Sequence, residues 1–399
     1  MTRRLSVLFV QTDCGGGVPP AIAVARRLRE QGHAVRFLAA RSLEGPLTRE
    51  GFAYEAFQQA PDFGSARRET DQLRDWEART PIGAVHALFN VMCGPAALHA
   101  ADVVDNLEAT PTDVVACDFM LLGAFVGAEA CRIPSVALVH TVAVIPLDGL
   151  PPIPYGLKPA HGLPGHWRDA FLRHARDRLL RRWLEVLNDA RARYQLTPVS
   201  NVYDQWFRAP RLLILSSPTF DFSASHLPEN VRYVGPAFWE APADTPLDLP
   251  ELSQAPLILA SLSTTYQAAE RYLRVLIAAL GSLPVQAVVT TGAGYDATDL
   301  PPCPTTSPCG RAARRRDPRR CHGRRDHATP NRPNRAEALA SHQTRPRAAG
   351  LPGGRPKDAS KPRSRGRRRQ RGGRNHCRGS RVRASAPDVS GPRASGRNP

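Results

Sequence analysis

The sequence predicts an α/β fold built from doubly wound units, followed by a long segment of different composition. Short apolar strands are followed by loops and then by helices, which is the order expected of a parallel sheet with crossover helices. Near Leu300 the large apolar residues almost vanish and arginine becomes abundant. We therefore expect a globular part up to about residue 300 and a basic tail after it.

The first unit begins with the apolar run Leu5–Val10, which is typical of a strand buried on both faces. A glycine loop over Thr12–Gly17 follows. Val18-Pro19-Pro20 opens a helix, because proline is tolerated in a first helical turn, and Gly32 ends it. Ala34–Leu38 is the next strand. In such units the loops after the strands lie at one edge of the sheet, where ligands bind.

The same order recurs further along the chain. Asp113–Asp118 and Ser135–His140 are predicted strands, with a helix over Met120–Ala130 between them. Asp118 and His140 therefore fall at the carboxyl ends of strands, on the ligand-binding edge.

Three more elements are predicted for the first domain: an arginine-rich helical stretch over Leu163–Tyr194, a strand over Arg211–Leu215 and a strand over Val231–Pro236. A second unit then follows, with strands over Leu257–Ala260 and Val285–Thr290 and a helix over Tyr266–Leu280. The expected organisation is a first domain over 1–239, a Pro/Ala/Asp-rich linker over 240–256, the start of a second domain over 257–300 and a tail over 301–399.

Three segments, Asp13–Pro20, Val231–Pro236 and Leu259–Thr265, together resemble the macrolide-type GT-B glycosyltransferases of natural-product biosynthesis. The resemblance spans roughly residues 3–300. It implies two Rossmann-like domains, the first binding a hydrophobic acceptor and the second a nucleoside diphosphate sugar. It also implies an inverting transfer without a metal or a cofactor other than the nucleotide sugar.

The resemblance also implies site residues. Donor-binding roles fall to Ser261, Ser263, Thr264 and Gly292, loop roles to Gly15, Gly16 and Gly17, and acceptor-pocket roles to Asp118 and Thr141. Most of these residues, Gly292 and Thr141 excepted, have a simpler alternative. The serines and threonine are also good helix caps, the glycines suit a tight turn, and Asp118 can serve by bonding nearby amides.

The catalytic base departs from the family pattern. Many relatives carry a histidine in the first glycine loop, and this chain has Gly17 in its place. Asp13 and His140 are the candidate replacements, because either can accept a hydrogen bond from an acceptor hydroxyl at this edge. The alternatives are a loop or capping role for Asp13 and a core role for His140.

The tail over 301–399 has 25 arginines and two lysines against five acids, and it lacks Phe, Trp, Tyr, Ile and Met. Such a composition predicts disorder, because it cannot bury enough apolar surface. The family's His-Gly-Gly run and acidic-Gln pair do not follow Gly292. We hypothesise out-of-frame translation beginning near 295–305, and we expect the chain to be inactive or nearly so. The tail's cysteines and histidines lack zinc-site spacing.

The whole chain carries a net charge of +18, and the tail, with 27 basic and five acidic residues, carries +22 of it. The first 300 residues therefore carry 18 − 22 = −4, and this mild acidity does not suggest nucleic-acid binding. Eight cysteines without regular spacing suit a reducing cytoplasm, and no signal peptide or membrane span is predicted. Two alternatives remain. One is a GT-B nucleotide-sugar epimerase, and the other is a non-enzymatic binding protein whose tail binds nucleic acid non-specifically. The oligomeric state is left open.

Overall fold

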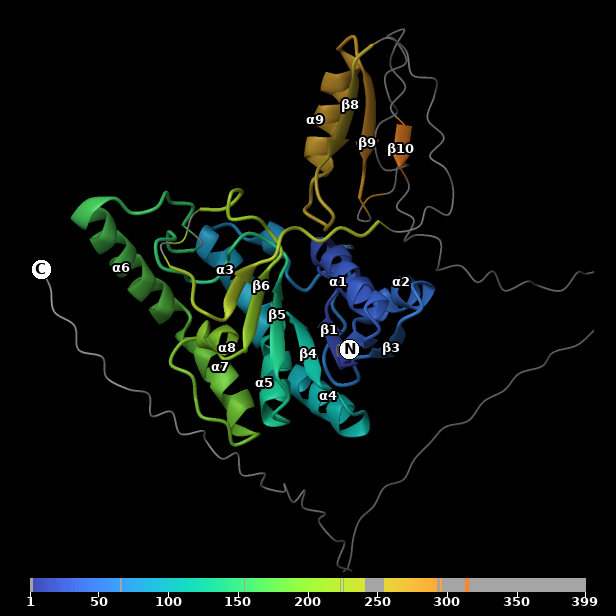
Figure 1. The fold of residues 1–399 in the computed structure, drawn as a ribbon. Coiled ribbons are helices and arrows are strands. Elements are labelled where there is room, and N and C mark those ends of the chain that lie inside the picture. The colour runs from blue at the N-terminus through green and yellow to red at the C-terminus, as the bar shows by residue number, and fades with distance from the viewer. Residues whose placement is uncertain are drawn as a thin grey trace, which may run out of the picture. The chain divides into compact units, whose positions relative to one another are not determined.

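The first domain is a seven-stranded parallel sheet with helices on both faces (Figure 1). The structure is a computed structural model that describes residues 3–64, 67–153, 155–222, 224, 226–240, 255–292 and 295, and the backbone of 313–315. The strand order is β3-β2-β1-β4-β5-β6-β7, that of a doubly wound sheet with a further edge strand. The strands are β1 (Ser6–Gln11), β2 (Ala34–Ala39), β3 (Ala53–Ala56), β4 (Val114–Asp118), β5 (Ser135–Val139), β6 (Arg211–Ile214) and β7 (Val231–Tyr233).

The helices of the first domain are α1 (Val18–Glu30), α2 (Glu44–Arg49), α3 (Pro81–Cys93), α4 (Ala96–Ala109), α5 (Leu122–Ala130), α6 (Gly162–Leu179), α7 (Arg181–Ala192) and α8 (Asp204–Phe207), with short 3-10 turns at Gly15–Gly17, Arg41–Leu43 and Asp75–Glu77. Helices α1 and α5 agree with the prediction. The single helical stretch predicted over Leu163–Tyr194 is two helices that meet at Leu180. The strand and helices over Ala53–Ala109 had no counterpart in the sequence prediction.

Strand β1 is buried on both faces, as predicted. Leu8 and Val10 belong to a large core cluster that contains residues of α3, α4, α5 and α7. Val7 and Phe9 point the other way, into a second cluster formed with α1 and with the residues around α2. This alternation follows from the two-residue period of a strand. It fixes the register of the central strands, and with it the position of the loops that follow them.

Helices α3 and α4 form a nearly continuous apolar stretch. Among the described residues, Pro81–Ala109 is long and apolar enough to cross a membrane by length and composition. Its buried residues, which include Phe89 and Ala100, pack in the first core cluster. Helix α5 approaches α4 closely: a Cβ added at Gly123 would lie 2.1 Å from the Ala96 carbonyl oxygen. One side of the stretch therefore belongs to the core, while Ile82 and Leu98 are exposed.

The second unit is a small parallel sheet in the order β10-β9-β8. It contains β8 (Leu257–Ser261), α9 (Glu270–Gly281), β9 (Gln286–Thr290) and β10 (Ala313–Arg315). The prediction of a tail without regular structure is wrong at 313–315, because this backbone pairs with Val288–Thr290. The rest of the predicted tail, and residues 241–254 of the predicted linker, lie outside the described residues.

Candidate active site

The carboxyl ends of β1, β4 and β5 lie side by side and bring their following residues together. Strand β4 pairs with β1 on one side and with β5 on the other, so Asp118 at the end of β4 lies between the loops after Gln11 and Val139. His140 is the first residue after β5. The two residues predicted at this edge, Asp118 and His140, do meet: their Oδ1 and Nδ1 atoms are 3.9 Å apart.

Asp118 is fully buried and well bonded. Its Oδ2 accepts a hydrogen bond from Gln11 Nε2 at 2.6 Å, and its Oδ1 accepts one from the Met120 amide at 3.0 Å. Burial raises the pKa of this carboxyl above its ordinary value, while the neighbouring His140 and the hydrogen bonds oppose the shift. Asp118 is therefore a buried residue held by hydrogen bonds, which favours the structural alternative.

His140 occupies the space directly over Gly17. A Cβ added at Gly17 would lie 2.4 Å from Cε1 and 2.5 Å from Nε2 of the imidazole. The ring also packs edge to face against Phe119, with centroids 4.9 Å apart. Position 17 thus has no side chain of its own, and His140, from the loop after β5, fills the volume next to it.

Cys14 completes the cluster, and the sequence prediction had not selected it. Its Sγ lies 3.6 Å from Asp118 Oδ2 and 3.6 Å from His140 Nε2. Burial and the charges of Asp118 and Asp13 raise the pKa of this thiol well above its usual value, so the sulfur is protonated at neutral pH. The sequence signal that could have identified Cys14 is its place in the loop after β1, directly before the three glycines.

Asp13, the other candidate base, is bound within its own loop region. Its Oδ2 accepts a hydrogen bond from Ser42 Oγ at 2.8 Å, and its Oδ1 accepts one from the Gly15 amide at 3.4 Å. The residue is 5% exposed. These contacts favour the loop-stabilising alternative over a base.

The predicted donor residues gather around the loop after β8. Gly292 has a left-handed φ of 65°, and a Cβ there would lie 2.8 Å from the Ser263 carbonyl oxygen. Gly15 also has a φ of 65°, and its Cβ would lie 2.9 Å from Thr265 and 3.1 Å from Thr264 Oγ1. Both glycines are therefore needed for conformation and for close approach. Ser261 and Thr264 are exposed.

The helix expected immediately after this loop begins later than predicted. Helix α9 begins at Glu270, and its N-cap is Ala269 without a side-chain hydrogen bond. Ala268 has a φ of 48°, which a helix does not allow. Ser263 bonds locally instead, accepting from the Thr265 amide at 3.1 Å. The alternative that these residues cap the helix is therefore wrong.

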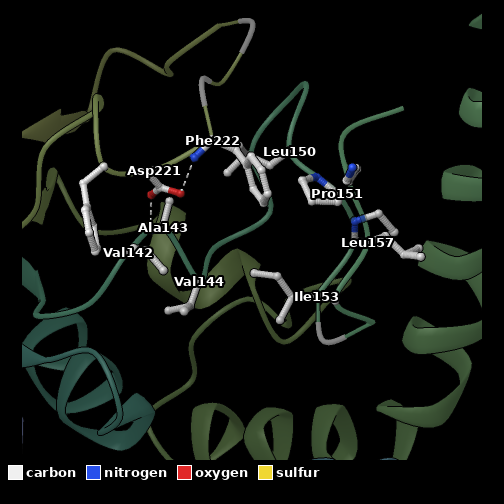
Figure 2. Close-up of a pocket in the computed structure, with 13 residues that line it drawn as sticks. Val142, Ala143, Val144, Leu150, Pro151, Ile153, Leu157, Asp221 and Phe222 are labelled. Atoms are coloured by element: carbon white, nitrogen blue, oxygen red, sulfur yellow. Dashed lines mark hydrogen bonds between the residues drawn. The ribbon is translucent and has the colours of Figure 1, made fainter. Parts of the chain in front are cut away.

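An apolar pocket opens beside the end of β5 (Figure 2). Its cavity volume is about 580 Å³, and the chain enters its wall at Val142, two residues after His140. The charged residues of its described lining are Lys158 and Asp221. Asp221 accepts bonds from the Ala143 amide, the Phe222 amide and the Tyr233 hydroxyl, so it holds the wall together. Thr141 bonds to the Val142 carbonyl and lies next to this pocket without lining it.

The arrangement has the parts of a proton-transfer site. An imidazole with a buried carboxylate behind it lies at the end of β5, and an apolar cavity follows along the same chain segment. The Nδ1 atom lies 3.9 Å from Asp118 Oδ1, and the Nε2 atom lies 3.6 Å from Cys14 Sγ. A neutral imidazole nitrogen at this place can act as a proton acceptor.

Several known glycosyltransferases are similar to this chain. The 4'-demethylrebeccamycin synthase of Lentzea aerocolonigenes is 29% identical over 304 residues, which cover 74% of this chain and 72% of that protein. The calicheamicin glycosyltransferase CalG4 is 21% identical, with a TM-score of 0.52 over 76% of this chain and 70% of its own. The glycotransferase of kitacinnamycin is 17% identical, with a TM-score of 0.50 over 75% and 70%. No protein-family model matches the chain. The shared architecture confirms the predicted GT-B fold.

Proposed function

We propose that this chain, a member of the GT-B glycosyltransferases of natural-product biosynthesis, transfers a hexose or deoxyhexose from a nucleoside diphosphate sugar to a hydroxyl of a hydrophobic acceptor. One observation supports this most strongly. The imidazole of His140 fills the space over Gly17, the position at which the family resemblance expects the catalytic histidine. A base from β5 thus takes the place of a base in the first glycine loop.

In this proposal His140 is the catalytic base and Asp118 is its positioning residue. Nε2 accepts the proton of the acceptor hydroxyl, whose oxygen attacks the anomeric carbon as the bond to the diphosphate breaks, with inversion. The carboxylate 3.9 Å from Nδ1 stabilises the imidazolium that forms. Such base catalysis contributes about 10²–10⁴-fold to a rate.

The apolar pocket is the proposed acceptor site. Proline, valine, leucine, isoleucine and phenylalanine side chains form most of its described wall, which suits a flat hydrophobic molecule. Lys158 is the proposed partner for a polar substituent, because Asp221, the other charged residue of that described wall, already accepts three hydrogen bonds. The pocket wall begins at Val142, two residues after the proposed base, and in this proposal the acceptor hydroxyl reaches Nε2 from that side.

The proposed donor site contains Ser263 and Thr264, with Gly292 and Gly15 allowing close backbone approach. Hydroxyls and amides here would hydrogen-bond the diphosphate, and no metal ion is required for transfer. Since the family's His-Gly-Gly run does not follow Gly292, we propose that this chain turns over slowly or not at all. It would still bind the acceptor.

Acceptor binding gives a test that does not depend on turnover. The purified chain is titrated with planar aromatic aglycones by calorimetry, and binding is expected at the pocket. Ile153→Asp in the pocket wall should abolish it, whereas Ile82→Asp, at a residue 58% exposed on α3, should leave it unchanged. Equal binding by both variants would place the acceptor elsewhere.

Transfer itself is tested with TDP- and UDP-sugars. The chain should give little product, and a chimera that continues after Gly292 with the complete second domain of a related transferase should give much more. In that chimera His140→Gln should lower kcat by about 10²–10⁴-fold without weakening aglycone binding. Rapid transfer by the unmodified chain would refute the proposed donor defect.

The two alternatives make different predictions. An epimerase would convert a nucleotide sugar without any acceptor, and the apolar pocket would have no role. A binding protein that uses its tail on nucleic acid would bind DNA with a sequence preference that is lost on deleting 301–399. No contact among the described residues favours either one.

A further inference from the structure

Cys14, Asp118 and His140 form a cluster of metal-ligating side chains, in which the two contacts of the thiol have near-tetrahedral spacing and the shortest imidazole–carboxylate distance is 3.9 Å. One ligand atom from each residue lies within 4.8 Å of the other two. The Cys14 Sγ atom is 3.6 Å from both His140 Nε2 and Asp118 Oδ2. With zinc bond lengths of about 2.3 Å to sulfur and about 2.0–2.1 Å to nitrogen or oxygen, a separation of 3.6 Å corresponds to an angle of about 110° at the ion.

The residues around the cluster already orient its ligand atoms. Gln11 donates to Asp118 Oδ2 and the Met120 amide donates to Oδ1, so the carboxylate is fixed. Of the two ring nitrogens of His140, Nε2 faces the Cys14 sulfur at 3.6 Å, while Nδ1 lies 3.9 Å from Asp118 Oδ1. Phe119 packs against the imidazole and restricts its rotation. These contacts resemble the outer-shell support of a metal centre.

We propose that Cys14, Asp118 and His140 bind a single zinc-class divalent cation, and that this binding blocks sugar transfer at the same site. The ion takes the place of the thiol proton that now links Sγ to Oδ2, and this proton is released to solvent. The fourth position is left to water. Thiolate and imidazole select a soft or borderline ion such as Zn²⁺ over Mg²⁺ or Ca²⁺.

The regulatory part rests on the proposed function. Coordination uses the Nε2 lone pair that would accept the acceptor proton, so a metal-loaded His140 is not a base. The metal-free form of the chimera is then the active one. Chelator should restore transfer to a zinc-inhibited chimera, and zinc should compete with the deprotonation step.

The binding test uses the full chain with its four tail cysteines replaced by serine, because Cys303, Cys309, Cys321 and Cys377 could bind metal independently. Zinc is titrated against a colorimetric chelator, and Co²⁺ is used as a spectroscopic probe. We expect one equivalent of zinc and the absorption bands of tetrahedral Co²⁺ with a thiolate ligand. Mg²⁺ should not compete.

Ligand variants decide the assignment. Cys14→Ser and His140→Gln should each weaken zinc binding at least roughly tenfold, since losing a direct ligand costs no less than losing an outer-shell partner. Cys131→Ser is the matched control, because Cys131 is a half-buried free thiol outside the cluster. Absence of stoichiometric zinc, or binding that Cys14→Ser leaves unchanged, overturns the metal site. Neither result bears on the proposed sugar transfer, which is measured separately in chelator.

Discussion

Substituting Gly17 with alanine should expel His140 from its position. Gly17 has a φ of −81° and a ψ of −19°, which alanine adopts without strain, so any effect is steric. The new Cβ would lie 2.4 Å from His140 Cε1 and 2.5 Å from both His140 Nε2 and Cys14 Sγ. Ordinary contacts are 3.4–4 Å, so the ring and the thiol must each move by roughly 1 Å or more.

The expected cost is about 1–3 kcal/mol, the usual range for overpacking a well-filled site. It is measured as the free energy of unfolding in urea. Gly16→Ala is the matched control, because its Cβ would lie 3.6 Å from Thr264 Oγ1, an ordinary contact. The control should stay within about 0.5 kcal/mol of the unmodified chain.

A mutant cycle tests whether the loss of stability in Gly17→Ala comes from the contacts with Cys14 and His140. In a background of Cys14→Ala and His140→Ala, both groups that the new methyl would strike are gone. Gly17→Ala should then cost less than about 0.5 kcal/mol, so most of the original cost appears as a coupling energy. If Gly17→Ala proves as harmless as Gly16→Ala in the unmodified chain, the imidazole does not lie where the structure has it, and the proposed base loses its main support.

Three predictions on stability follow from buried polar groups. Burial lowers the pKa of His99 to about 4, whereas the same histidine in the unfolded chain has a pKa near 6.5. The free energy of unfolding should therefore fall by about 2 kcal/mol from neutral pH to pH 5, because the unfolded state binds the proton more tightly. His99→Gln should remove this pH-dependent loss, measured by urea unfolding at a series of pH values. Arg191 is fully buried and pairs with Glu129 at 2.7 Å, so Arg191→Met should cost about 3–5 kcal/mol in urea, and a cost below 1 kcal/mol would contradict a functional ion pair. The Asp102 carboxylate accepts bonds from the backbone amides of three successive residues, 58–60; Asp102→Ala should lower the urea midpoint by the equivalent of about 3 kcal/mol, and an unchanged midpoint would refute this anchoring role.

The central sheet was predictable because most of its strands have a recognisable local sequence pattern. Leu5–Val10 and Ser135–His140 are apolar and β-branched runs, and each lies within one or two residues of the observed strand. Gly32, with a φ of 89°, ends α1 as expected. The register of parallel strands then fixes which loops meet, so Asp118 and His140 could be placed on one edge in advance.

Other features depend on contacts that local patterns do not encode. Strand β3, with the sequence Ala-Tyr-Glu-Ala, is a short half-exposed edge strand without an apolar run, and its pairing with β2 defines it. The late start of α9 depends on the left-handed backbone of Ala268 and on the Tyr295 hydroxyl, which accepts a hydrogen bond from the Ala269 amide. The fit of His140 over Gly17 joins residues far apart in the sequence, and only the tertiary structure brings them together.

The second unit exposes one side of β8. Its described core consists of a few residues around Leu273 and Ile277 on α9, against Val289 of β9. Leu257 and Leu259 of β8 are 51% and 70% exposed, because the described residues supply no second layer over that face. A sheet of this class is ordinarily covered on both faces. Among the described residues, nothing therefore covers the face of β8 that contains Leu257 and Leu259.

The contact between positions 17 and 140 yields a prediction about relatives. The two side chains compete for one volume, since a Cβ at 17 already overlaps the imidazole from 140. A chain with histidine at the position of Gly17 should therefore have a small residue at the position of His140, and a chain with glycine at the first position is free to carry histidine at the second. Swapping them, as Gly17→His with His140→Ala in the active chimera, should return the base to the first glycine loop and recover part of the transfer that His140→Ala removes. If the swapped chimera folds, binds aglycone and still shows no more transfer than His140→Ala alone, the two positions are not interchangeable sources of one base.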